Sequence, residues 1–158
     1  MDSTIIYKRG LAVMSENFGH VTEMYLATSA KDIVAVRDMH AYYRDGKMYV
    51  LSKLGNTVMN DISVNPNVGM CRGSHYMQGT ARSLGHPLEP QNAAIRKFLK
   101  KEFSMNYDEY VTEEDSNMRI LEITLTRAET YTKFHRYEID YVTQTARRDH
   151  TEPLFIYQ

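Results

Sequence analysis

The chain has 158 residues, of which 42% are hydrophobic and 25% charged, so we expect one domain of ordinary size around a hydrophobic core. Its formal net charge of −1 argues against binding to nucleic acid or to an anionic membrane through bulk charge. The single cysteine, Cys71, excludes an intramolecular disulfide framework. The sequence shows neither a signal-peptide pattern nor a run of the roughly 20 apolar residues that span a bilayer, so we expect a cytoplasmic protein.

A helix and three strands are predicted in the first part of the chain. A patchy apolar stripe predicts a helix over residues 3–18, and β-rich runs predict strands over 21–29 and 33–43. Residues 45–46 are Asp-Gly, a dipeptide typical of a two-residue hairpin turn. The strand predicted at 48–54 therefore returns antiparallel to the strand before it.

Helices flank a β segment in the middle of the chain. The apolar positions of residues 56–64 predict a short helix. Residues 67–84 predict a strand pair or one long bent strand, with Gly73 and Gly79 as candidates for a bend or bulge. The strongest helical pattern follows at 87–103, where apolar residues share one face and basic residues the other.

One long strand between two polar segments is predicted in the last part of the chain. Residues 107–117 form an acidic loop, and residues 118–132 alternate between apolar and polar side chains as a strand does. The segment from residue 134 onward is polar but contains aromatic side chains that a folded protein rarely leaves unpacked. We treat 1–158 as a single domain in which 135–158 is a C-terminal tail that docks on the domain or on a second subunit.

The predicted elements together indicate a mainly β protein with short helices, of the α+β class. Short strands joined by tight turns favour a small antiparallel barrel. An α+β sandwich is the competing architecture.

The passage from the hairpin into the helix at 56–64 combines local structure with ligand chemistry. A strand that leads into a helix N-terminus offers free backbone N–H groups and the positive end of the helix dipole, which suit an anion such as phosphate. Hydroxyl, amide and ammonium donors are added by Ser52, Lys53, Asn56 and Thr57. An ordinary N-cap formed by Asn56 explains the same pattern, and both interpretations can hold together.

Arg37 lies in an otherwise apolar strand. A planar guanidinium is well suited to bidentate binding of phosphate. Pairing with Asp38, with Asp61 or with an acidic residue at an interface is the alternative.

Further candidates are expected on the opposite face from Arg37. His40 and Tyr42 share that face, where they would line a ligand ring or position a substrate. A half-buried strand histidine with one hydrogen bond is the alternative for His40, and the sequence favours it. Gln78, just before Gly79, would reach the edge of the same ring. The six histidines show no metal-binding spacing, and no P-loop or dinucleotide-binding glycine pattern is present, so no metal is expected.

Five fragments between residues 21 and 131 follow one another in an order that a known family shows. They are MYLATS, VRDMHAYYRDGKMYVLS, NDISVNPNVGMC, QGTARSLG and MRILEITLTRAETY. The third contains an I-x-x-N-P-x-V pattern, and the fourth contains a G-x-A element at Gly79 and Ala81. The ordered set resembles the flavin mononucleotide (FMN)-binding split barrels related to pyridoxamine 5'-phosphate oxidase, which implies a six-stranded antiparallel split β-barrel.

The resemblance also implies a homodimer with cofactor sites at the subunit interface. In that family a strand arginine, hydroxyl residues and a helix lysine hold the phosphate. By position these correspond here to Arg37 and to Ser52, with Lys53 beside it. The chain departs from the pattern at Asn56, where the family often has serine, and at Val58, where it often has lysine.

The implied activity is that of an FMN-dependent oxidoreductase acting on a small molecule. His40, Tyr42 and Gln78 would lie near the flavin ring, and no residue need act as an essential acid or base. The same fold with a deazaflavin or haem is an alternative, and so is a cofactor-free binding or stress-response module, which the valine at position 58 favours.

Overall fold

The computed structural model describes residues 2–103 and 107–152. The elements in chain order are α1 (Ser3–Phe18), β1 (Thr22–Ala30), β2 (Ile33–Arg44), β3 (Lys47–Lys53), α2 (Thr57–Val64), β4 (Asn67–Arg72), β5 (His75–Gly85), α3 (Ala93–Glu102), α4 (Tyr107–Tyr110), β6 (Met118–Tyr131), β7 (His135–Asp140) and β8 (Thr145–His150). Up to β3, and again at α2 and β6, the predicted boundaries are confirmed to within one residue at each end. None of the helices described is both long enough and apolar enough to cross a membrane.

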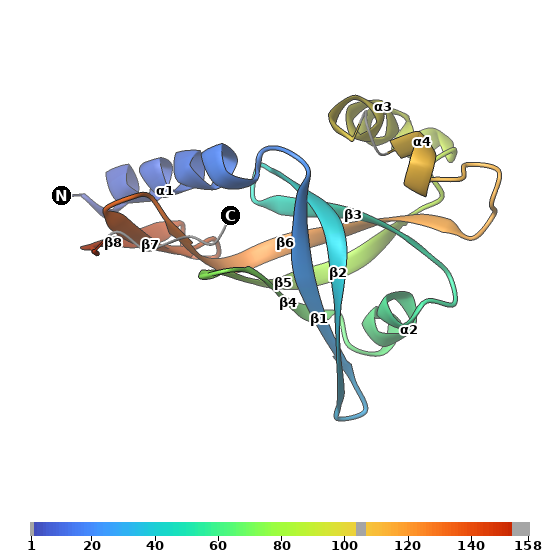
Figure 1. Ribbon diagram of the computed structural model, residues 1–158, viewed down its shortest axis with the longest axis horizontal. Coiled ribbons are helices and arrows are strands. Elements are labelled where there is room, and N and C mark those ends of the chain that lie inside the picture. The colour runs from blue at the N-terminus through green and yellow to red at the C-terminus, as the bar shows by residue number, and fades with distance from the viewer. Residues whose placement is uncertain (1, 104–106, 153–158) are drawn as a thin grey trace.

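All eight strands belong to one antiparallel sheet, in the order β3-β2-β1-β4-β5-β6-β7-β8. Strand β3 also pairs with β6, from Lys47 opposite Thr124 to Lys53 opposite Met118. This pairing closes β1 to β6 into a six-stranded barrel, and β7 and β8 extend the sheet beyond it (Figure 1). The predicted split barrel is therefore confirmed, in preference to the sandwich.

Two-residue turns connect the first three strands. Asp45 and Gly46, between β2 and β3, both have positive φ, at 50° and 78°. The turn between β1 and β2 has the same conformation without a glycine, since Lys31 and Asp32 have φ of 52° and 63°. Turns of this kind match the twist of the strands they join, and they fix the register of both hairpins.

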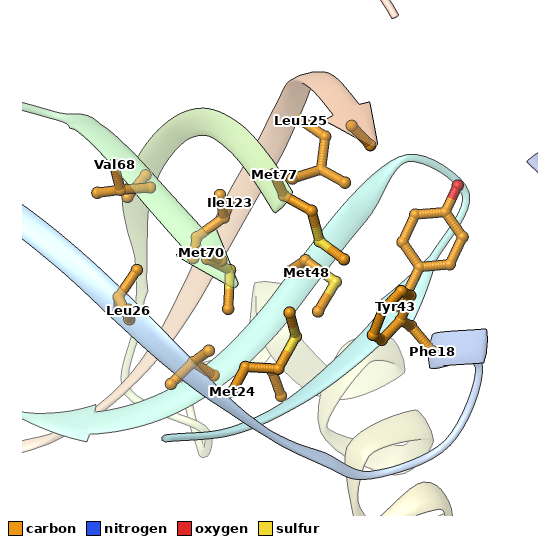
Figure 2. Packing of buried hydrophobic residues seen from close by; sticks show 14 of the residues in the cluster. Phe18, Met24, Leu26, Tyr43, Met48, Val68, Met70, Met77, Ile123 and Leu125 are labelled. Carbon is orange, nitrogen blue, oxygen red and sulfur yellow. The ribbon is translucent and has the colours of Figure 1, made fainter. Parts of the chain in front are cut away.

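Methionines from four strands fill the barrel interior. Figure 2 shows Met24, Met48, Met70 and Met77 pointing toward one another from β1, β3, β4 and β5. All four are buried, together with branched side chains such as Ile123. Flexible thioether side chains fill irregular gaps well, and this accounts for a core that is rich in methionine and lacks tryptophan.

A second apolar cluster lies outside the barrel, where α3 and α4 cover β2, β3 and β6. Leu99, Phe103, Tyr107 and Val111 pack there against strand residues such as Ile120. The predicted acidic loop at 107–117 is wrong at its start, because α4 begins at Tyr107 and both Tyr107 and Val111 are buried. The alternating pattern of β6 predicts only one buried face and so gave no sign of this cluster. The outer face of β6 also carries buried apolar residues.

The helix predicted at 87–103 begins later, at Ala93. A turn and a 3₁₀ helix at Pro90–Asn92 precede it. The buried Asn92 amide donates to the carbonyls of Leu84 and His86, at 2.8 and 2.9 Å, and these side-chain bonds hold the segment in a turn. Sequence periodicity does not report such side-chain bonds.

Two strands occupy most of the described part of the predicted C-terminal tail. β7 and β8 form a hairpin that packs against α1 (Figure 1). Tyr137 and Ile139 are buried, as expected for packed residues, whereas Phe155 and Tyr157 lie outside the described residues. The treatment of 1–158 as one domain stays a prediction.

Gly79 lies at a β-bulge, where the pairing of β5 with β6 shifts register between Gln78 and Gly79. A Cβ atom at this position would lie 2.5 Å from the Thr124 carbonyl oxygen. Because that oxygen belongs to the backbone of the barrel wall, the strand itself would have to move.

We expect Gly79→Ala to lower the free energy of unfolding by about 1–3 kcal/mol, the usual cost of overpacking. Gly69→Ala is the matched control, since its new Cβ would lie 3.8 Å from the nearest atom. Urea denaturation of both variants checks this, and equal losses would contradict the close approach at Gly79.

His75 is the first residue of β5, and its side chain is buried. Its Nδ1 lies 2.9 Å from the Thr130 hydroxyl, which also accepts a bond from the Asn17 amide. The imidazole packs edge-on against the rings of Phe18 and Tyr131. Burial, with a smaller contribution from the charge of Arg72, lowers the pKa of His75 below its ordinary value of 6.5.

Acidification should therefore destabilise the protein. The unfolded chain binds a proton at His75 near pH 6.5 and the folded chain does not, so the free energy of unfolding falls as pH drops below 6.5, by about 1.4 kcal/mol per pH unit at most. Urea denaturation at pH 7.5 and 5.5 should show a larger loss for the wild type than for His75→Gln. The same loss in both proteins would contradict this assignment.

Candidate functional site

A cleft opens where β2 and β3 separate. The two strands pair only through Tyr42–Arg44 and Lys47–Tyr49. Beyond these pairs β2 continues beside β1, while β3 leads into α2. The cleft between them has a volume of about 500 Å³ and is lined by Arg37, Asp38, Met39, Ser52, Gly55, Asn56, Thr57 and Val58.

Four of the eight residues predicted from the sequence meet in this cleft, namely Arg37, Ser52, Asn56 and Thr57. Ser52 is buried near the end of β3, and the Asn56 side-chain amide lies 3.4 Å from its hydroxyl oxygen. Arg37 of β2 is therefore close in space to the residues of the β3–α2 connection, although it is distant from them in the sequence. The sequence predicts this proximity.

The N-terminus of α2 faces the cleft without a side-chain cap. Asn56 occupies the N-cap position with extended backbone, but its side chain makes no capping bond. The first backbone N–H groups of a helix have no partner within the helix. Together with the hydroxyls of Ser52 and Thr57, they form a set of neutral donors at the positive end of the helix dipole, suited to an anionic oxygen group.

Arg37 lies in the wall of the cleft and contacts the barrel through one of its terminal nitrogens. Nη1 donates to the Leu26 carbonyl at 3.2 Å and to the Thr28 hydroxyl at 2.8 Å. Nη2 is 3.8 Å from the Asp61 carboxylate, and the Thr28 hydroxyl donates to that same carboxylate. The alternative in which Arg37 pairs with Asp61 is thus confirmed as an ion pair.

The guanidinium of Arg37 is incompletely satisfied. Nη2 is buried and has no hydrogen-bond partner, because 3.8 Å is too long for a hydrogen bond. Burial lowers the pKa of Arg37, and the Asp61 carboxylate opposes that shift. An arginine keeps its charge under all ordinary conditions, so the wall of the cleft holds a cation with spare hydrogen-bonding capacity.

The other cation predicted here points elsewhere. Lys53 Nζ lies 2.8 Å from the Asp115 carboxylate, and Lys53 does not line the cleft. Val58 is buried and carries no charge. Of the described residues that line the cleft, Arg37 alone is cationic, and Asp38 is anionic.

The three residues predicted near a ligand ring lie outside this cleft. Tyr42 packs edge-on against Phe98 of the outer cluster, with ring centroids 5.1 Å apart. Gln78 lines a separate cavity of about 230 Å³ between β5, β6 and β7. His40 is half-buried opposite Glu23 of β1. Their roles stay predictions.

Thr28 is the residue of the Arg37 environment that the sequence analysis missed. The two-residue turn between β1 and β2 places Arg37 opposite Leu26, so that Thr28 is a diagonal neighbour on the same face. Thr28 could have been identified from that register. The approach of Asp61 depends on how α2 packs on β1, which local sequence does not report. No cluster of three or more histidine, cysteine or acidic residues suited to a metal occurs within 2–103 and 107–152.

Comparison with known proteins supports the fold. No protein-family model and no curated protein matches the sequence. Among solved structures, a putative pyridoxamine 5'-phosphate oxidase from Listeria innocua is 16% identical with a TM-score of 0.54, over 78% of this chain and 95% of that chain. An FAD-binding protein from Mesorhizobium loti is 15% identical with a TM-score of 0.59, over 77% and 90%. An F420 reductase is 17% identical with a TM-score of 0.55, over 72% and 94%.

Identities this low establish a common fold. The chain therefore has the split-barrel fold of pyridoxamine 5'-phosphate oxidase-like proteins, as its ordered fragments predict.

Proposed function

We propose that the protein binds FMN, with the phosphate in the cleft at the N-terminus of α2, and that it acts as an oxidoreductase on a small molecule. The observation that carries this proposal is the uncapped helix end beside Arg37, whose Nη2 is buried and lacks a hydrogen-bond partner. The donor set fits a phosphate: backbone N–H groups, the Ser52 and Thr57 hydroxyls, the Asn56 amide and one guanidinium.

The chain's own part in such a reaction is to bind and orient. The bound flavin would supply the hydride or electron chemistry. The phosphate would be anchored by Arg37, Ser52, Asn56 and Thr57. The rigid barrel wall would fix the direction in which the flavin ring extends from the cleft. Substrate specificity would be determined by the protein surface beyond the phosphate site, and this surface differs among proteins of one fold.

A deazaflavin is the second candidate cofactor. The cleft offers one cation, Arg37, which is shared with Asp61 and lies near Asp38. A phosphate monoester carries a charge of about −1.5 to −2 at neutral pH, whereas a phosphodiester such as that of F420 carries a single charge at the phosphate. The low positive charge of the cleft favours the diester, and parallel titrations with both cofactors distinguish the two candidates.

We also propose that a second copy of the chain completes the site. Tyr25, Val34, Val36 and Tyr76 are each more than half exposed. Tyr25 pairs with Cys71 and Cys71 with Tyr76, so Tyr25 and Tyr76 lie on the same outer face of β1, β4 and β5. Val34 and Val36 extend this face onto β2, opposite Ser29 and Ala27 of β1. An exposed apolar sheet face of this kind supports a protein–protein interface.

Replacing Arg37 should weaken FMN binding. We expect Arg37→Met to reduce the binding free energy by about 1.5–3 kcal/mol, the scale of a hydrogen bond to a charged group. Arg44→Met is the matched control, because Arg44 lies on the same strand but packs over Phe98, away from the cleft. Flavin fluorescence titration checks both variants. Equal affinities in Arg37→Met and the wild type would remove Arg37 from the site.

A charge on the apolar face should prevent dimerisation. We expect Val36→Glu to be monomeric by sedimentation velocity, while the wild type is a dimer. Ile33→Glu is the control, since Ile33 is equally exposed but alternates to the other face of β2. A monomeric wild type, or a dimeric Val36→Glu variant, would contradict this assignment of the interface.

A further inference from the structure

Asp61 is an acidic residue beside a cleft that we propose binds an anion, and neither the fold nor the phosphate donors account for it. It lies on α2 with its side chain 15% exposed, facing the barrel and not the cleft. Its carboxylate accepts a hydrogen bond from the Thr28 hydroxyl and lies 3.8 Å from Arg37 Nη2. An acidic residue is thus placed against the single cation among the described residues that line the cleft.

The geometry around Arg37 leaves the guanidinium between two partners. Nη1 is bound by the Leu26 carbonyl and the Thr28 hydroxyl, while Nη2 is buried and too far from Asp61 for a hydrogen bond. The carboxylate therefore attracts the guanidinium without satisfying it. An anion in the cleft offers the same guanidinium a second set of acceptors, and the two anions compete for one cation.

We infer that Asp61 restrains Arg37 and thereby lowers the affinity of the cleft for phosphate. This inference rests on the proposed function, since it assigns a regulating residue to the same site. Asp61 is a positioning residue: it touches no ligand, and it acts through Arg37. A phosphate must draw the guanidinium away from Asp61, so a ligand held by the phosphate alone binds weakly, and a ligand that also contacts the protein through its ring is selected.

The variant Asp61→Asn tests this inference directly. The amide keeps an oxygen that can accept from Thr28, but it removes the charge that competes for Arg37. We expect Asp61→Asn to bind FMN about tenfold more tightly than the wild type, the low end of the effect of a hydrogen bond to a charged group. Riboflavin, which has the same ring and no phosphate, should bind both proteins equally.

A double-mutant cycle separates competition from a general change in charge or structure. In an Arg37→Met background, Asp61→Asn should leave FMN affinity unchanged, because the shared cation is gone. Asp38→Asn is the matched control: Asp38 lines the cleft but makes no ion pair with Arg37 within the described part of the chain, so any gain there should persist without Arg37. Asp61→Ser serves as a second variant with the same expected direction.

The outcomes separate this inference from the proposed function. Three results would overturn the role of Asp61 and leave the proposed function standing. The wild type binds FMN and Asp61→Asn binds it no more tightly, or the gain in FMN affinity persists in the Arg37→Met background, or the gain extends to riboflavin. Binding by Asp61→Asn but not by the wild type upholds the restraint and overturns FMN as the natural ligand. Failure of both proteins to bind FMN or inorganic phosphate overturns both.

Discussion

The pairing of β3 with β6 is the constraint on which the rest of the structure depends. It closes the barrel from Lys47 to Lys53, and a further bond from the Leu54 amide to the Asn117 carbonyl, at 2.9 Å, continues it past the end of the strand. The end of β3 is thereby held to β6 while β2 stays with β1, and the two hairpin strands must separate. Ser52, the start of α2 and Arg37 lie around the opening that this separation leaves. The cleft is therefore a consequence of barrel closure.

The chemistry of the cleft follows from how few charges it contains. Its donors are mainly neutral, namely backbone N–H groups, hydroxyls and an amide, and its one cation is shared with a carboxylate behind it. Neutral donors at a helix end recognise an anionic oxygen by geometry, whereas a free cation would attract any anion. Val58 stands in place of a charged side chain and Lys53 is held by Asp115, so under the proposed function the site would favour a matched ligand over simple phosphate.

Much of the fold could be predicted because its signals are local. Positive-φ turns, alternating strands and the bulge at Gly79 are each encoded within a few residues, and the order of the fragments identified the barrel. What could not be predicted depends on side-chain bonds and packing contacts that sequence periodicity does not report. Asn92 delays the start of α3 through bonds to Leu84 and His86, and the outer cluster turns part of an acidic segment into α4. At the site, the donors around α2 were predicted from local sequence. The sequence offered Asp61 as one of several partners for Arg37, and only the packing of α2 on the barrel decides between them.

Under the proposed function, the cleft holds the phosphate of a flavin. The most direct measurement is the visible absorption spectrum of the purified protein after FMN has been added and the unbound ligand removed by desalting. We expect a retained and shifted flavin spectrum at about one flavin per chain. A colourless protein that releases all of the added FMN would contradict it.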